Sequence, residues 1–125
     1  MKHEILVIDD NFDIRNLISG ILKDKNYTVR EAANYDQAVF EIDKKLPDLA
    51  VIDVKLDKGD KDGIDLLKKI KKITDLTPVV MISGHANVEM AVESLKLGAY
   101  EFITKPFAME QLLNIVARGL ENINL

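Results

Sequence analysis

The chain repeats one pattern five times: a short apolar run, a break, and then a stretch with helical spacing of its apolar residues. Three of the runs are continuous rather than alternating, as in strands that are buried on both faces of a parallel sheet. Strands are predicted at 4–8, 27–32, 49–52, 79–82 and 100–104, and helices at 14–22, 35–45, 64–73, 88–95 and 109–120. This alternation predicts an α/β fold, a doubly wound (βα)5 sandwich in which helices cover both faces of a five-stranded parallel sheet.

Some residues mark the faces and ends of these helices. The apolar stripe of the first helix is predicted to face the core, and it comprises Ile14, Leu17, Ile18 and Ile21. Asn26 and Gly98 are predicted to end the first and fourth helices, because both residue types tolerate the left-handed backbone found there.

Composition narrows the class of protein. A length of 125 residues is typical of one domain. With no cysteine and two histidines, a disulfide framework, a thiolate metal site and a multi-histidine metal site are excluded. The formal net charge of −4 argues against a general nucleic-acid surface. The apolar run at 5–8 is too short for a signal or membrane segment and is followed by two aspartates, so we expect a cytoplasmic protein without membrane contact.

Polar residues collect where the predicted strands end. Asp9 and Asp10 follow the first strand, Asp53 the third, Ser83 the fourth and Lys105 the fifth. Each could instead be a helix cap, a turn residue or a surface lysine. In a doubly wound sheet, however, ligands bind at the carboxyl ends of the strands, where these side chains would converge.

That convergence predicts a phosphoryl site. Neighbouring carboxylates repel one another and need a cation or protonation, and an oxygen-only ligand set favours Mg²⁺. An aspartate can accept a phosphoryl group as an acyl phosphate, which a lysine and a hydroxyl would stabilise. No glycine-rich phosphate-binding loop is present, so nucleotide binding is not predicted.

Five segments, in this order, resemble the receiver domains of two-component response regulators over essentially the whole chain. They are 5–10, 49–53, Asp62-Gly63, 79–84 and 98–107. The resemblance implies the flavodoxin-like, CheY-like strand order 2-1-3-4-5. It also implies a protein that is not a turnover enzyme, although it assists its own phosphorylation and dephosphorylation.

The resemblance assigns roles to individual residues. Asp53 is the expected phosphoacceptor, and a sensor histidine kinase is the expected donor of its phosphoryl group. Asp10, Asp53 and the main-chain carbonyl of Lys55 are the expected Mg²⁺ ligands, and Asp9 acts through a metal-bound water. Ser83 and Lys105 contact the phosphoryl group, and the Lys105–Pro106 bond is expected to be cis. Phe102, and not Tyr100, is the expected switch aromatic that turns inward when Ser83 moves.

Within the family, residues 82–87 and 98–103 resemble the NtrC class and its NtrX-like branch. Members of that class add an AAA+ module and a DNA-binding module, so residues 1–125 are expected to be the N-terminal receiver of a longer transcriptional regulator, which reaches DNA only through modules absent from this chain. Its output surface, and a possible homodimer, would involve the fourth helix, fifth strand and fifth helix. Gln111 and Ile115 replace residues that tie dimers in the OmpR-like class.

The segment after Asp53 departs from many receivers. It is long, charged and free of proline up to Gly63, so the resemblance does not define the shape of the backbone near the phosphate. A long segment at this position is typical of the NtrX-like branch. Lys55 and His85 follow Asp53 and Ser83 by two residues and could tune the phosphate lifetime, or could simply point into solvent.

Three alternative functions share features with this sequence. A haloacid-dehalogenase-like phosphatase is disfavoured, because Lys55 occupies the position of the required general acid. A pseudo-receiver that binds partners without phosphorylation and a stand-alone CheY-like receiver both stay open.

Overall fold

The computed structural model describes residues 2–84 and 88–123. Strands and helices alternate along the chain. The strands are β1 (Glu4–Ile8), β2 (Thr28–Ala32), β3 (Leu49–Asp53), β4 (Val79–Ser83) and β5 (Glu101–Thr104). The helices are α1 (Phe12–Asp24), α2 (Tyr35–Lys44), α3 (Asp62–Ile73), α4 (Val88–Lys96) and α5 (Met109–Ile123). The predicted elements are confirmed, with boundaries that shift by a few residues.

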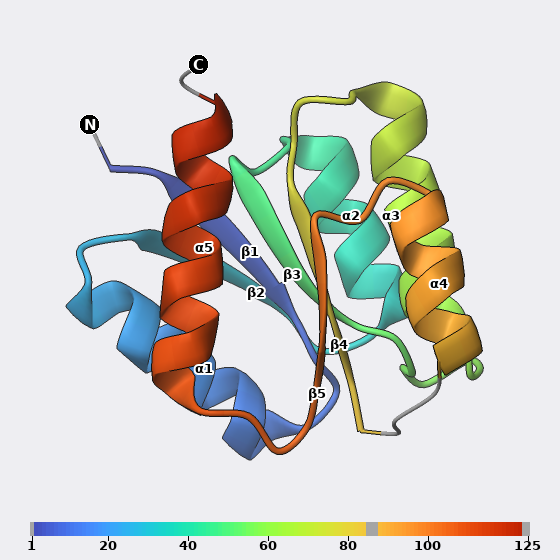
Figure 1. Ribbon diagram of the computed structural model, residues 1–125, viewed down its shortest axis with the longest axis horizontal. Coiled ribbons are helices and arrows are strands. Elements are labelled where there is room, and N and C mark those ends of the chain that lie inside the picture. The colour runs from blue at the N-terminus through green and yellow to red at the C-terminus, as the bar shows by residue number, and fades with distance from the viewer. Residues whose placement is uncertain (1, 85–87, 124–125) are drawn as a thin grey trace.

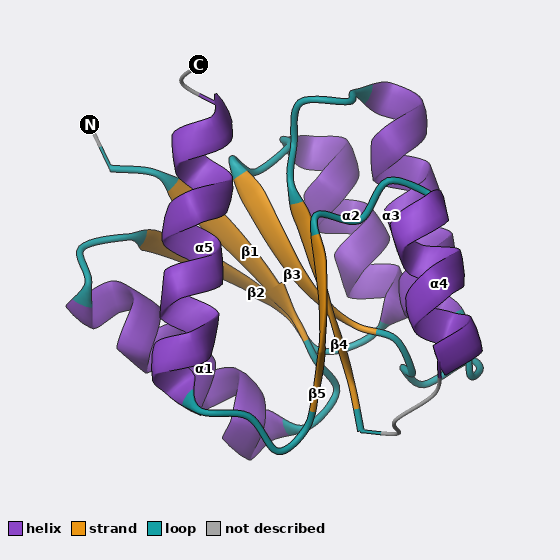
Figure 2. Cartoon of the chain, in the orientation of Figure 1, coloured by secondary structure: helices purple, strands orange, loops and turns teal. Residues whose placement is uncertain are grey.

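The five strands form one parallel sheet in the order β2-β1-β3-β4-β5, as predicted. Helices α1 and α5 cover one face, and α2, α3 and α4 cover the other (Figures 1 and 2). Each face has its own apolar cluster. One contains Ile18 and Val116 and the other Ala38 and Leu67, so the sheet separates two cores. Apart from a polar residue at one end of each, the inner strands β1, β3 and β4 are apolar, because they meet helices on both sides.

Local signals set the helix ends. The Asn11 side chain accepts a hydrogen bond from the amide of Ile14, and Asn34 accepts one from Gln37. Each asparagine thereby satisfies an amide that the first helical turn leaves unpaired. Asn26 follows α1 with φ of 71°, and Gly98 follows α4 with φ of 104°. Both therefore end their helices in the left-handed region, as the sequence predicted.

Two apolar stripes are more exposed than their spacing suggested. The prediction that Leu17 faces the core is wrong: its neighbour Ile18 is buried, whereas Leu17 is exposed. On α4, Val88, Val92 and Leu95 are exposed, and the buried residue is Ser94. Helix α4 packs near the β5 edge of the sheet, where one narrow side of it is enough to close the core.

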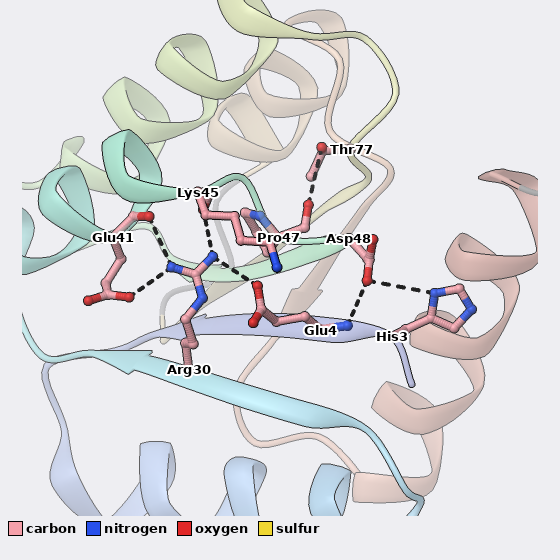
Figure 3. A network of polar contacts seen from close by, with 8 residues as sticks. All are labelled: His3, Glu4, Arg30, Glu41, Lys45, Pro47, Asp48 and Thr77. Atoms are coloured by element: carbon pink, nitrogen blue, oxygen red, sulfur yellow. Dashed lines mark hydrogen bonds and ion pairs between the residues drawn. The ribbon is translucent and has the colours of Figure 1, made fainter. Parts of the chain in front are cut away.

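A polar network ties the elements near the amino ends of β1 and β3 (Figure 3). The Arg30 guanidinium, on β2, donates to the Glu41 carboxylate at 2.8 Å and to the Lys45 carbonyl at 2.6 Å, and it forms an ion pair with Glu4 at 3.1 Å. The Asp48 carboxylate accepts from the amide of Glu4 at 2.7 Å. This network lies away from the carboxyl ends of the strands and stabilises the opposite edge.

In the part of the chain that the structure describes, no helix is both long enough and apolar enough to cross a membrane.

Candidate functional site

The carboxyl ends of β1, β3, β4 and β5 bring the predicted polar residues to one edge of the sheet. Asp9 directly follows β1, while Asp53 and Ser83 are the last residues of β3 and β4. The strands are in register there, because Asp53 lies opposite Ile82 and Ser83 opposite Thr104. Lys105 follows Thr104, and its amide donates to the Ser83 carbonyl at 2.7 Å. Residues that are far apart in sequence therefore share one site.

Lys105 bridges two buried carboxylates. Its ammonium Nζ lies 3.0 Å from Asp9 Oδ2 and 3.1 Å from Asp53 Oδ2. Asp9 is 1% exposed and Asp53 6% exposed. Two anions that are this deeply buried need a partner of opposite charge, and the lysine supplies it.

The charges at this edge perturb one another. Burial, and then the neighbouring Asp9 carboxylate, raise the pKa of Asp53 from 3.8 to about 6, although Lys105 opposes the rise. Burial alone would lower the pKa of the Lys105 ammonium, but the two carboxylates outweigh it and raise that pKa. Lys105 therefore stays protonated, and the neighbouring Asp53 carboxylate binds a proton more tightly than an ordinary aspartate does.

A third carboxylate stands at the rim. Asp10 is exposed, and oxygen atoms of Asp9, Asp10 and Asp53 lie within 4.8 Å of one another. The Asp9 Oδ1 atom also accepts from the amide of Asn11 at 2.9 Å, which fixes the orientation of this side chain. The donor set is oxygen only and anionic, and it therefore suits Mg²⁺ better than a soft metal.

The remaining predicted site residues lie around this cluster. Ser83 is buried at the end of β4. Phe102 is partly buried and packs against the core on the α2, α3 and α4 face, opposite Met81 of β4. The Lys105–Pro106 peptide bond is cis. Tyr100, by contrast, packs against the core on the other face of the sheet.

The segment after Asp53 turns back to the same edge. The amide of Lys55 lies 3.4 Å from Asp53 Oδ1, and the Lys55 ammonium forms an exposed ion pair with Asp60 at 3.7 Å. The Lys55 side chain therefore points toward the loop rather than into the carboxylate cluster. His85, its predicted counterpart after Ser83, lies outside the described residues.

The sequence assigns no role to two neighbours of the site, Arg15 and Asp62. Arg15, on α1, donates to the Asp9 carbonyl at 2.8 Å and to Glu31 at 3.1 Å. Asp62 is 6% exposed and accepts hydrogen bonds within the loop that follows Asp53. Asp62-Gly63 is one of the segments that resemble receiver domains, and that resemblance is the sequence signal that could have drawn attention to Asp62.

Comparison with known proteins identifies the class. The family model of the response regulator receiver domain matches residues 5–117. The chain belongs to this family and, as a receiver domain, is not a turnover enzyme. The triad of Asp9, Asp10 and Asp53 is the typical magnesium site of receivers.

Within the family the chain resembles NtrX. It is 46% identical over 125 residues to the nitrogen assimilation regulatory protein NtrX of Azorhizobium caulinodans. The crystal structure of the receiver domain of NtrX from Brucella abortus superposes with a TM-score of 0.85 and 46% identity, covering 94% of this chain and 98% of that one.

Relatives of two lengths match. The match to the Azorhizobium protein covers all of this chain but only 28% of that protein. It is also 32% identical to sporulation initiation phosphotransferase F of Bacillus subtilis, covering 96% of this chain and 95% of that protein. The receiver fold thus occurs in the relatives both as part of a long chain and as nearly a whole protein.

Proposed function

We propose that this chain is the phosphoacceptor receiver of a two-component system and that Asp53 carries the phosphoryl group. The observation that supports this most directly is the placement of Asp53 at the end of a central strand, bridged through Lys105 to Asp9 and within reach of Asp10. The donor is the phosphohistidine of a sensor histidine kinase.

The transfer needs little from the protein beyond position and charge. A carboxylate oxygen of Asp53 attacks phosphorus. The new phosphorus–oxygen bond forms as the phosphorus–nitrogen bond breaks, and the imidazole leaves with the bonding electrons. The Lys105 ammonium, now shared between Asp9 and Asp53, moves to the incoming phosphoryl oxygens. The Ser83 hydroxyl donates to the same group.

The carboxylates suit a magnesium ion. Asp10, Asp53 and the main-chain carbonyl of Lys55 would hold it, with Asp9 acting through a bound water, and once bound the ion would neutralise the charge of the phosphoryl group. Until then, repulsion between the carboxylates is relieved by Lys105 and by the raised proton affinity of Asp53.

Phosphorylation then biases a switch. Ser83 and Phe102 change position together, and the change reaches the surface of α4, β5 and α5. On α4 this surface presents exposed Val88, Val92 and Leu95, an apolar stripe suited to contact with a second copy of the chain. The phosphoryl group can shift the equilibrium toward the active conformation only to the extent that it stabilises that conformation more than the inactive one.

The whole protein is proposed to be a cytoplasmic transcriptional regulator like NtrX. Residues 1–125 would form its N-terminal receiver, and modules outside this chain would supply ATPase activity and DNA binding. Lys55 and His85 would tune how long the phosphate survives. Measuring the phosphate half-life in Lys55→Ala tests this last point, since an unchanged half-life sinks it.

The central experiment is phosphorylation by a small-molecule acyl phosphate with Mg²⁺, followed by intact mass. The wild type should gain one phosphoryl group. Asp53→Asn should gain none, whereas Asp60→Asn, which removes an exposed carboxylate from the following loop, should gain one as before. No gain in the wild type at any Mg²⁺ concentration would falsify the proposal and favour the pseudo-receiver.

A further inference from the structure

Asp62 is a buried carboxylate that organises the loop between Asp53 and α3. It is the first residue of α3 and is 6% exposed. Its Oδ2 accepts hydrogen bonds from the amide of Lys58 at 2.8 Å and from that of Gly59 at 3.0 Å. Asp57 and Asp60, the other carboxylates of the loop, are exposed. A buried carboxylate that accepts hydrogen bonds from two backbone amides makes strong and specific contacts.

The far end of this loop is pinned against the end of β3, beside the backbone of the phosphoacceptor. The amide of Gly63 donates to the Val54 carbonyl at 2.7 Å. A Cβ atom on Gly63 would lie 2.2 Å from the Asp53 carbonyl oxygen, so the start of α3 presses directly on the end of β3. A displacement of Asp62 would therefore shift the backbone within one or two residues of Asp53.

The middle of the loop depends on Asp62. Leu56 is 3% exposed and anchors the chain just after Lys55. Beyond it, Lys58 and Gly59 are held by the Asp62 carboxylate, which closes the turn. Among the outer contacts of the loop are the Asp57 carboxylate with the Tyr35 amide at 2.9 Å and the Lys58 ammonium with Asp36 at 3.1 Å. Both contacts are exposed, and an exposed ion pair such as that of Lys58 with Asp36 stabilises little.

We propose that Asp62 is a positioning residue of the phosphoacceptor site. By closing the turn, its carboxylate sets the path of the backbone at Lys55 and thereby the direction of the carbonyl that is to bind Mg²⁺. The inference rests on the proposed function, and it adds a residue that acts through the loop rather than on the phosphoryl group. Groups that orient a metal ligand commonly change metal affinity ten- to a hundredfold when removed, so a loss of about tenfold is expected.

The test is Mg²⁺ affinity, measured by calorimetry on the 125-residue chain at a temperature where each variant is folded. Asp62→Ala should bind Mg²⁺ about tenfold more weakly than the wild type. Asp62→Asn, which keeps an oxygen acceptor, should bind within about threefold. The matched control is Asp60→Ala, which removes one charge from the same loop and leaves the hydrogen bonds from the Lys58 and Gly59 amides to Asp62 in place. It loses only an exposed ion pair with the Lys55 side chain and should leave the affinity within about twofold.

A second measurement separates positioning from stability. Without metal, hydrogen exchange of the Lys58 and Gly59 amides should accelerate in Asp62→Ala and not in Asp60→Ala. If Asp62→Ala does not fold, Asp62→Glu takes its place, because it keeps the charge but shifts the acceptor by one methylene, and it should also bind Mg²⁺ more weakly.

The outcomes distinguish this inference from the function it rests on. Wild-type Mg²⁺ affinity in a folded Asp62→Ala or Asp62→Glu variant overturns the positioning role and leaves the phosphoacceptor site intact. Absence of Mg²⁺ binding by the wild type overturns the proposed function itself.

Discussion

The Asp53 carboxylate is expected to destabilise the metal-free protein at neutral pH, and Asp53→Asn should relieve this. Burial and the Asp9 carboxylate raise its pKa from 3.8 to about 6. The folded protein therefore binds this proton more tightly than the unfolded chain, and the free energy of unfolding falls as pH rises from about 4 to about 6, and then levels off.

The size of the effect follows from that pKa. Each tenfold change in proton affinity is worth about 1.4 kcal/mol, so the charged form costs about 2 to 3 kcal/mol above pH 7, the lower figure allowing for solvent at the rim of the site. Near pH 4 the cost is under about 1 kcal/mol, because the folded protein is then mostly protonated at this site. Asparagine resembles the protonated acid and still offers Lys105 an acceptor.

Urea unfolding followed by circular dichroism, in a chelator, measures this directly. The free energy of unfolding of Asp53→Asn should exceed that of the wild type by about 2 to 3 kcal/mol at pH 7.5, and by under about 1 kcal/mol near pH 4. Asp60→Asn is the control: this side chain is 79% exposed, so its effect should hardly vary with pH. A gain that is the same at both pH values, or a variant less stable than the wild type at pH 7.5, would refute the reasoning.

Three further predictions concern single residues. Lys105→Met removes the cation between two buried carboxylates and should raise the pKa of Asp53 above about 6, as followed by carboxyl NMR; an unchanged or lower pKa would contradict the bridge. Gly63→Ala places a Cβ 2.2 Å from a backbone oxygen and should cost about 2 to 4 kcal/mol in urea unfolding. Gly20→Ala, where no atom lies within 4 Å, should instead stabilise α1 by about 0.5 to 1 kcal/mol, and a similar loss at both glycines would show that crowding is not the cause. Asn34→Ala removes the cap of α2 and should cost about 1 kcal/mol, whereas no change in the unfolding midpoint would mean that water replaces the cap.

Most of the fold could be predicted because its signals are local. Continuous apolar runs require burial on both faces, and helical spacing between them requires crossover connections, so a parallel sheet follows from short stretches of sequence. The same reasoning placed Asp9, Asp53, Ser83 and Lys105 together, since parallel strands all end at one edge. The strand order came only from the resemblance to a known family.

What covers a helix could not be predicted from its spacing. Leu17 and the stripe of Val88, Val92 and Leu95 have the spacing of a buried face, yet they are exposed. Periodicity shows that a helix has an apolar side, but it does not show how much of that side a neighbour covers. At α4, near the edge of the sheet, the answer depends on how the helix sits against β5.

The chain by itself determined the kind of site: oxygen ligands, no thiolate, and carboxylates and a lysine at the ends of successive strands. Only the tertiary structure decided how these groups share charge. It placed Lys105 between Asp9 and Asp53, left Asp10 at the rim, and buried Asp62 beneath the loop. The physical reason is that a charge interaction depends on distance and burial, and neither is defined until separate elements pack together.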